Sequence, residues 1–279
     1  MTSTRVLVVG GGGPLGAAVT GDLQSRRIPA LITRRIGPEP LDVSNHAAVT
    51  DALAAVRPES VIYLANPGVE TIQEDAVGSS VDDLRHFAAR AAESDVERII
   101  FASSAAVYGT SWTRPVSEDD HADGPGLYAD LKRRSEHVLR EVAETTRLTA
   151  SALRIFNIFG PGFSRSLVSR LASGEPRAVL QVSDSFVRDY VHAADVARAL
   201  VLASEHSHPG FRVLNIGTGI ATDNIELSRL AAPGSYSIAA SPTSPSYCVA
   251  NVARAREALR FQPTWSVAEY LAEAAARRV

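Results

Sequence analysis

Tyr128, Lys132 and Ser104 have the side-chain types and the spacing needed to move a proton. Tyr128 and Lys132 are four residues apart, so on a helix they lie on one face and the ammonium group can sit near the phenol. A phenol in water ionises at about pH 10, and an adjacent cation lowers its pKa by favouring the phenolate. Ser104 supplies a hydroxyl able to orient a substrate oxygen. We therefore expect an acid/base site centred on Tyr128, although the same Tyr/Lys spacing also occurs as a surface pair on amphipathic helices.

A glycine-rich turn near the amino terminus is the second feature with chemical meaning. It consists of Gly10, Gly13, Pro14, Leu15 and Gly16, directly after the apolar run 6–9 and before an amphipathic stretch. Missing side chains let the backbone approach a pyrophosphate, and the helix that follows offers free N–H groups and the positive end of its dipole. A strand, this turn and a helix in succession predict a dinucleotide-binding site.

The residues after the second apolar run bear on the choice of cofactor. NAD-binding domains carry an acidic residue there, about 20 residues beyond the glycines, but this chain has Arg34 and Arg35. Guanidinium groups suit a 2′-phosphate, so the pair favours NADP(H), unless both side chains are simply solvated. Asp42 follows where such domains often hold the adenine ring, or it is a turn residue. Leu64 and Ala65 end an apolar run, as is needed where backbone passes close to a cofactor.

Short apolar runs alternate with amphipathic stretches through the first half of the chain. The runs are residues 6–9, 30–33, 61–65, 99–103 and 149–156, and the stretches lie near 15–26, 47–56, 81–94 and 128–146. Continuous apolar strands separated by helices indicate a parallel sheet covered on both faces. We therefore expect an α/β fold with a doubly wound parallel sheet of the Rossmann type.

The alternation of apolar runs and amphipathic stretches becomes irregular after about residue 160. Glycine and proline interrupt the chain there, and the helical patterns become shorter. We expect residues 1–160 to form the NADP(H)-binding domain and residues 161–279 to form mainly a smaller substrate-binding lobe. The segment 211–217 again resembles a strand, and we expect it to return to the first domain.

Composition and charge exclude several classes of protein. The formal net charge of -3 argues against a nucleic-acid partner, and no run of about 18 apolar residues exists to span a membrane. The single cysteine, Cys248, cannot form an intrachain disulfide, which favours a reducing cytoplasm. His206 and His208 lack the carboxylates or cysteines that would complete a ligand set, so we expect no metal site. His192 lies at a helix start and is expected to be structural. The acidic run at residues 118–120, next to His121, is expected to be a solvated loop, with substrate contact as the alternative because the run lies just before the stretch 128–146.

The chain resembles the extended short-chain dehydrogenase/reductase family, in the branch of nucleotide-sugar epimerases, dehydratases and ketoreductases. The motifs are GGGGPLG, VIYLAN, FASSAAVYG, YADLK, LRIFNIFGPG, VRDYVHAADVARAL, LNIGTG and FQPTWSV, and they cover nearly the whole chain. The resemblance implies that Ser104 donates a hydrogen bond to the substrate oxygen, Tyr128 is the acid/base and Lys132 holds the nicotinamide ribose. It also implies that Asn157 and Arg188 bind the diphosphate of a sugar-nucleotide substrate.

Two departures from the family pattern narrow the activity. Dehydratases of this branch carry an Asp-Glu pair after the catalytic hydroxyl residue, and this chain has Ala105 and Ala106 there. Elimination needs that extra acid and base, so a 4,6-dehydratase is disfavoured. The late Arg-Pro-Gly-Asp-like motif of the epimerases is absent, and residues 242–246 stand roughly in its place. The sequence therefore leaves open whether the substrate carries a nucleotide.

The leading hypothesis is an NADPH-dependent ketoreductase, acting on a ketone such as C4 of a 4-keto-6-deoxy nucleotide sugar, with Tyr128 as proton donor. The alternatives are a nucleotide-sugar 4-epimerase, which in this family usually retains NAD, and a non-catalytic NADP(H)-binding regulatory protein. Proteins of the last kind typically lose the Tyr/Lys pair, which is present here. The stretches 81–94 and 128–146 match helices that form the homodimer interface in the family, so we expect a homodimer.

Overall fold

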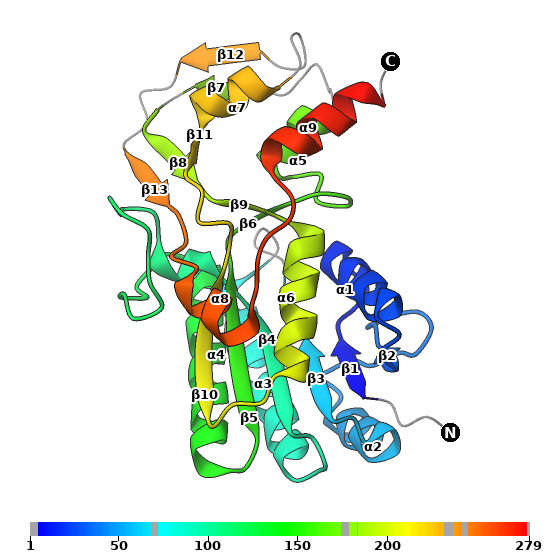
Figure 1. Ribbon diagram of the computed structural model, residues 1–279. Helices are drawn as coiled ribbons and strands as arrows, with labels where there is room; N and C mark the ends of the chain where they lie inside the picture. Colours follow the sequence, from blue (N-terminus) through cyan, green and yellow to red (C-terminus); the bar gives the residue numbers. More distant parts are fainter. Residues whose placement is uncertain are drawn as a thin grey trace.

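The computed structural model describes residues 5–67, 72–173, 179–182, 184–231, 237–240 and 245–277. Its centre is a six-stranded, all-parallel sheet in the order β10-β5-β4-β3-β1-β2 (Figure 1). The strands are β1 (Val6–Val9), β2 (Ala30–Ile32), β3 (Ser60–Tyr63), β4 (Arg98–Ser104), β5 (Thr149–Ile155) and β10 (Phe211–Ile216). The chain moves to one side of β1 and then returns to its other side, so a ligand crevice is expected at the carboxyl ends of β1 and β3. This is the doubly wound α/β fold that the sequence predicts.

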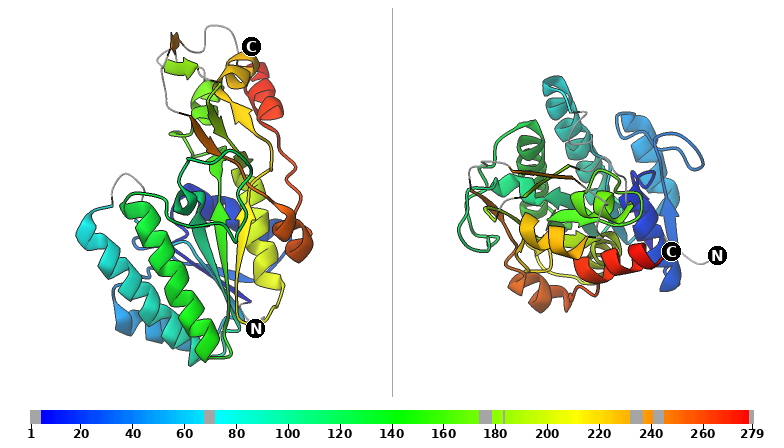
Figure 2. Two further views of the ribbon diagram at one scale, coloured as in Figure 1. Left: turned by 90° about the vertical axis from the view of Figure 1, so that its left-hand side faces the viewer. Right: turned by 90° about the horizontal axis from the view of Figure 1, so that it is seen from above.

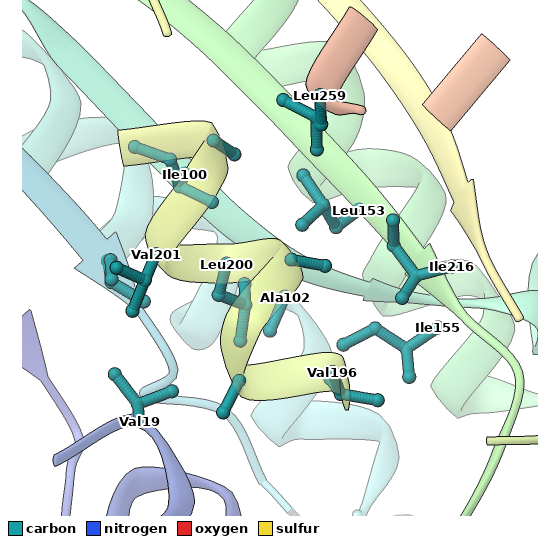
Figure 3. Close-up of a cluster of buried hydrophobic side chains, with 14 of the residues drawn as sticks. Val19, Ile100, Ala102, Leu153, Ile155, Val196, Leu200, Val201, Ile216 and Leu259 are labelled. Atoms are coloured by element: carbon teal, nitrogen blue, oxygen red, sulfur yellow. The ribbon is translucent and has the colours of Figure 1, made fainter. Parts of the chain in front are cut away.

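Helices cover both faces of the sheet (Figures 1 and 2). They are α1 (Pro14–Ser25), α2 (His46–Val56), α3 (Glu74–Ala92), α4 (Leu127–Thr145), α6 (Ala193–Glu205) and α8 (Ala253–Leu259). The first face carries α1, α6 and α8, whose apolar side chains pack on the sheet in the cluster of Figure 3. The second face carries α2, α3 and α4.

The alternation of side chains along β1 explains why its sequence is apolar at every position. Val6 and Val8 point into the core beneath α1 and α6, whereas Leu7 and Val9 point into the core beneath α2 and α3. A strand with one buried face would alternate apolar and polar residues, but a strand buried on both faces cannot.

A smaller lobe lies beyond the carboxyl ends of the strands, at the top of Figure 1. Its elements are β6 (Asn157–Phe159), α5 (Leu167–Ser173), β7 (Val179–Val182), β8 (Phe186–Arg188), β9 (Tyr190–His192), β11 (Thr222–Asp223), α7 (Asn224–Leu230), β12 (Ser237–Ala240), β13 (Ser246–Cys248) and α9 (Val267–Ala276). Three small sheets, β11-β8-β13, β12-β7 and β6-β9, hold it together. Its own core draws residues from three separate parts of the chain, including Phe159, Leu227 and Leu271.

The start of one helix and the extent of the lobe differ from what the sequence predicts. The helix expected near residues 81–94 begins earlier, at Glu74. Its first turn combines Glu74 and Asp75, which suit the positive end of the helix dipole, with Val77, which is buried. The segment 211–217 does return to the sheet, as β10, and α6 and α8 from the part assigned to the lobe also pack on the sheet. None of the helices among the described residues is long and apolar enough to cross a membrane.

Candidate active site

The structure brings Ser104, Tyr128 and Lys132 together where β4 and α4 meet. β4 ends at Ser104, and Tyr128 and Lys132 occupy the first two turns of α4. A side-chain hydrogen bond joins Tyr128 to Ser104, and the Lys132 Nζ lies 5.3 Å from the centre of the Tyr128 ring. Lys132 is only 2% exposed, and its Nζ donates a 2.6 Å hydrogen bond to the carbonyl oxygen of Ala102. The Ser-Tyr-Lys arrangement expected from spacing is therefore present in space.

Burial sets the protonation of this group. It raises the pKa of Tyr128, which the hydrogen bond from Ser104 only partly offsets. It also lowers the pKa of Lys132 to about 7, against the opposing effect of the Glu136 carboxylate. The prediction of a lowered phenol pKa is therefore wrong, because removal from water disfavours the phenolate and also weakens the neighbouring cation. The phenol is protonated at neutral pH and suited to giving up a proton.

A cleft runs along the carboxyl ends of β1 and β3 in two connected parts. The outer cavity, of about 740 Å3, is lined by Gly10, Gly12, Gly13, Arg35, Leu41, Asp42, Val43, Ser44, Tyr63, Leu64, Ala65, Asn66, Pro67, Ala76, Ser80 and Asp83. The inner cavity, of about 260 Å3, shares Gly10, Gly13, Leu64, Asn66 and Pro67 with it. The inner cavity also reaches Pro14, Leu15 and Gly16 at one end and Ser104, Tyr128 and Lys132 at the other. The cleft therefore connects the glycine turn to the acid/base residues.

The glycines of the turn have distinct roles. Gly10 has a φ of +82°, and a Cβ there would lie 2.5 Å from the backbone nitrogen of Ala65. A Cβ on Gly16 would meet the backbone oxygen of Gly11 at 2.4 Å, so both positions require glycine for close packing. A Cβ on Gly13 would meet nothing within 4 Å, and Gly13 precedes α1 without any side-chain cap. The first turn of α1 therefore faces open space with unpaired N–H groups, which fits a pyrophosphate.

The residues after β2 separate into two roles. Arg35 lines the outer cavity together with Asp42, whereas the Arg34 side chain lies alongside Gly12 at the turn. Neither arginine forms an ion pair with a carboxylate in the described part of the chain. Asp42 Oδ1 accepts hydrogen bonds from the backbone nitrogen of Ser44 at 3.1 Å and from its hydroxyl at 2.8 Å, which lower the pKa of Asp42. Arg35 is thus an exposed cation at the wall of the outer cavity, close enough to Asp42 for its charge to help lower the pKa of that carboxyl.

Asn66 is a candidate that the sequence reasoning missed. It lines both the outer and the inner cavity, and its buried Nδ2 has no hydrogen-bond partner among the described residues. A buried amide without a partner is costly, so a polar ligand at this point would satisfy it. Its signal was available, because Asn66 directly follows the apolar run that ends at Ala65.

A third cavity, of about 870 Å3, lies between the acid/base residues and the lobe, and we call it the lobe cavity. It shares Ser104, Tyr128, Ile155 and Phe156 with the inner cavity. Asn157 and Arg188 also line it, so the structure brings into one cavity the two residues that the resemblance implies bind a diphosphate, and that binding stays a prediction. The Asn157 Nδ2 donates to the backbone oxygen of Asp189 at 3.1 Å.

Arg188 is held in place by neutral groups. Its guanidinium donates 2.9 Å bonds to the carbonyl oxygens of Val187 and Ser246 and a 2.8 Å bond to the Ser246 hydroxyl, and it stacks 3.9 Å from the centre of the Phe186 ring. No carboxylate in the described part of the chain pairs with it. Burial lowers the pKa of Arg188, so an uncompensated cation in this cavity gains from an anionic ligand.

The loop between β4 and α4 adds Trp112, His121 and Asp123 to the lobe cavity, and none of the three was predicted as a site residue. The acidic run at residues 118–120 of the same loop is less solvated than expected at its first residue. Glu118 is only 9% exposed, and its Oε1 accepts a 2.8 Å bond from the backbone nitrogen of Asn215. A single sequence shows a charge run but not the strand end that buries it.

The histidines have ordinary roles. His192 caps α6, with its Nδ1 accepting from the backbone nitrogen of Ala194 at 3.2 Å, as expected for a structural residue. His208 Nε2 lies 2.8 Å from the Ser151 hydroxyl. Across the described ranges, no group of three or more His, Cys, Asp or Glu side chains is placed to hold a metal ion.

The parallel sheet, the glycine turn and the Ser104–Tyr128–Lys132 group define a dinucleotide-binding enzyme of the extended short-chain dehydrogenase/reductase class. A family model described as the NAD dependent epimerase/dehydratase family matches residues 6–217, and the chain belongs to this family.

Similar proteins include a UDP-glucose 4-epimerase of Mycoplasma genitalium, 25% identical over 97% of this chain and 95% of its own. A dTDP-L-rhamnose 4-epimerase of Burkholderia thailandensis is 26% identical over 82% of this chain and 80% of its own. Among solved structures, MoeE5 in complex with UDP-glucuronic acid and NAD has a TM-score of 0.84 at 26% identity, covering 99% of this chain and 100% of that one.

Proposed function

We propose that the chain is an NADP(H)-dependent oxidoreductase that reduces a ketone on a nucleotide-linked sugar. The observation that carries this proposal is the position of Ser104 and Tyr128, which line both the inner cavity and the lobe cavity. A dinucleotide lying on the glycine turn and a sugar entering past Arg188 would therefore meet at the same two hydroxyl groups.

The protein's own residues divide the work of reduction. The Ser104 hydroxyl orients the substrate oxygen, and the Tyr128 phenol gives that oxygen its proton. Lys132 supports the phenol and lies where it can bond the nicotinamide ribose. The bound nicotinamide supplies the hydride. The raised pKa of Tyr128 leaves the phenol protonated at neutral pH, which is the form that proton donation requires.

Arg188 supports the assignment of a nucleotide-linked substrate. Its charge faces the lobe cavity with only neutral partners, as a diphosphate site requires. Arg35 supports NADP(H), because a guanidinium at the wall of the outer cavity would attract a 2′-phosphate and no carboxylate occupies residues 33–38 to bind a ribose hydroxyl.

A second candidate is a nucleotide-sugar 4-epimerase, favoured by the names of the relatives that match most of the chain. Epimerisation would use the same Ser104–Tyr128–Lys132 group twice, first to remove and then to return hydrogen. The third hypothesis, a non-catalytic regulatory protein, has less support because these three residues are in contact. We also propose a homodimer formed through α3 and α4, which analytical ultracentrifugation can test.

Assays of the purified protein distinguish the two reactions. One assay contains NADPH and a 4-keto-6-deoxy nucleotide sugar, and the other contains UDP-glucose and NAD. Ketoreductase activity would consume NADPH in proportion to the 4-hydroxy product. Interconversion of UDP-glucose and UDP-galactose without net cofactor change would instead select the epimerase. Tyr128→Phe should lower kcat about a hundredfold or more in either reaction while cofactor binding survives, the usual scale for a lost general acid.

A further inference from the structure

Three consecutive residues of β4 are bonded to three residues of α4 that are spaced four apart. The pairs are Ala102 with Lys132, Ser103 with Glu136, and Ser104 with Tyr128. Residues four apart lie on one face of a helix, so a single face of α4 is attached to the end of β4. Two of the pairs contain the acid/base residues, and the third contains Glu136, which has no role in the proposed reaction.

Glu136 is a buried carboxylate whose oxygens are fully engaged. It is 5% exposed, and its Oε1 accepts a 2.5 Å bond from the Ser103 hydroxyl. Arg154 on β5, also 5% exposed, donates from Nε to Oε1 at 3.1 Å and from a terminal nitrogen to Oε2 at 2.7 Å. Burial alone would lower the pKa of Arg154, but the bonds and charge of Glu136 together raise it, so the arginine stays charged.

Stability alone does not explain this pair. The free energy needed to remove two charges from water is about as large as the free energy gained from their attraction. Apolar residues of similar volume in the same place often give equal or greater stability. The pair instead places a negative charge one helical turn from Lys132 and anchors the residue that precedes Ser104.

We propose that Glu136 is a positioning residue: its charge keeps Lys132 in the ammonium form, and its bond to Ser103 fixes the strand end that carries Ser104. The proposal rests on the acid/base roles given above to Ser104, Tyr128 and Lys132, whichever of the two reactions the enzyme performs.

The surroundings of Lys132 offer no other carboxylate for this role in the described part of the chain. From β4 it meets the Phe101 ring at 4.7 Å and the Ala102 carbonyl, and α4 itself contributes Tyr128. The other elements packed on α4 contact it at other residues. Val77 and Val81 of α3 pack with Leu131 and Val138, Phe211 of β10 lies beside Arg140, and Arg154 of β5 pairs with Glu136 and lies over the Tyr108 ring. Burial opposes the ammonium form, and Glu136 is the group that favours it.

Lys132 can be observed directly, because it is the only lysine in the sequence. Protein labelled with 13C-lysine should give a single side-chain Cε signal, whose pH titration reports on Lys132 with or without added NADP+. Glu136→Gln keeps the size and most hydrogen bonds of the side chain but removes the charge. We expect the Lys132 titration to move to lower pH by about one unit, the low end of the effect of a nearby charge.

Activity gives the second measurement. The fall of kcat/KM at alkaline pH should move with the Lys132 titration. At pH 8 the kcat/KM of Glu136→Gln should therefore be about tenfold below that of wild type, whereas at pH 5.5 the two values should agree within about twofold. Ser103→Ala keeps the charge, so it should lower kcat at every pH without moving the titration. Glu136→Asp should restore the titration toward wild type.

Asp195→Asn is the matched control, because Asp195 is another buried carboxylate, paired with Arg198 at 2.8 Å on α6. It should reduce thermal stability and leave the Lys132 titration unchanged. A Glu136→Gln titration that coincides with wild type would overturn the charge role, and an unchanged kcat in Ser103→Ala would overturn the anchoring role. Because the lysine signal does not depend on turnover, failure of the proposed activity would be seen separately, as absence of product from wild type.

Discussion

Gly162 lies against Pro14, so close that a Cβ on Gly162 would stand 2.8 Å from the Cβ of Pro14. This contact joins the first loop of the lobe to the turn that begins α1. It also places the lobe directly over the end of the cleft, since the neighbouring Phe163 lines the inner cavity.

Gly162→Val should therefore weaken cofactor binding, because the added side chain must displace Pro14 or the loop. We expect Kd for NADPH to rise about tenfold, equivalent to about 1.4 kcal/mol, in a fluorescence titration. Gly210→Val is the control, because Gly210 also has a positive φ but its Cβ would meet nothing within 4 Å. Equal effects of the two substitutions on Kd would show that backbone strain, rather than the Pro14 contact, is responsible.

Arg35→Ala should reduce selectivity for NADPH. The loss of a charge-assisted bond to a 2′-phosphate should weaken NADPH about tenfold or more and leave NADH nearly unchanged. Arg34→Ala is the neighbouring control, and its effect should be smaller because Arg34 lies along Gly12 rather than in the outer cavity. Wild-type protein that binds NADH as tightly as NADPH would contradict the cofactor proposal.

Arg188→Ala should raise KM for a nucleotide-linked sugar far more than for a small ketone that carries no phosphate, because only the former has charge to match. Ser246→Ala removes one bond to the guanidinium but leaves the charge in the cavity, so its effect should be much smaller. If Arg188→Ala raises both KM values equally, Arg188 does not bind the diphosphate.

Lys132→Met should inactivate the enzyme and stabilise the fold. The pKa of Lys132 is about 7 in the folded protein against 10.5 for a lysine in water, so between these values the unfolded chain binds more protons. Stability contributed by this site therefore rises with pH from about 7 to 10.5 and is lowest below pH 7. We expect Lys132→Met to raise the free energy of unfolding at pH 7 by about 2–4 kcal/mol, a range that already allows for the lost hydrogen bond to Ala102. Urea denaturation at pH 7 and pH 10 checks this, because the gain over wild type should shrink at the higher pH.

The sheet could be predicted because strands buried on both faces, such as β1 and β3, are apolar at nearly every position. Tyr128 and Lys132 could be predicted because their contact depends only on the geometry of one helix. The glycine turn was equally local, since Gly16 meets the backbone of Gly11 within the same βα unit.

Contacts between segments that are distant in the chain could not be predicted from a single sequence. Glu136 and Arg154 each resemble an ordinary surface charge, and only the packing of α4 on β5 reveals a buried pair. The phenol pKa was misjudged for the same reason, because spacing shows which cation is near Tyr128 but not how deeply both are buried. Arg34 and Arg35 could not be distinguished because the turn after β2 decides which of them enters the cavity.

The core of the lobe has a consequence for how substrate range can change. Phe159, Leu227 and Leu271 pack together there, yet each reaches the lobe in a different excursion of the chain from the sheet. No single insertion or transplanted segment would therefore carry a new lobe with it. New specificity in this scaffold should arise by point substitutions around the lobe cavity, which directed evolution can explore without recombination.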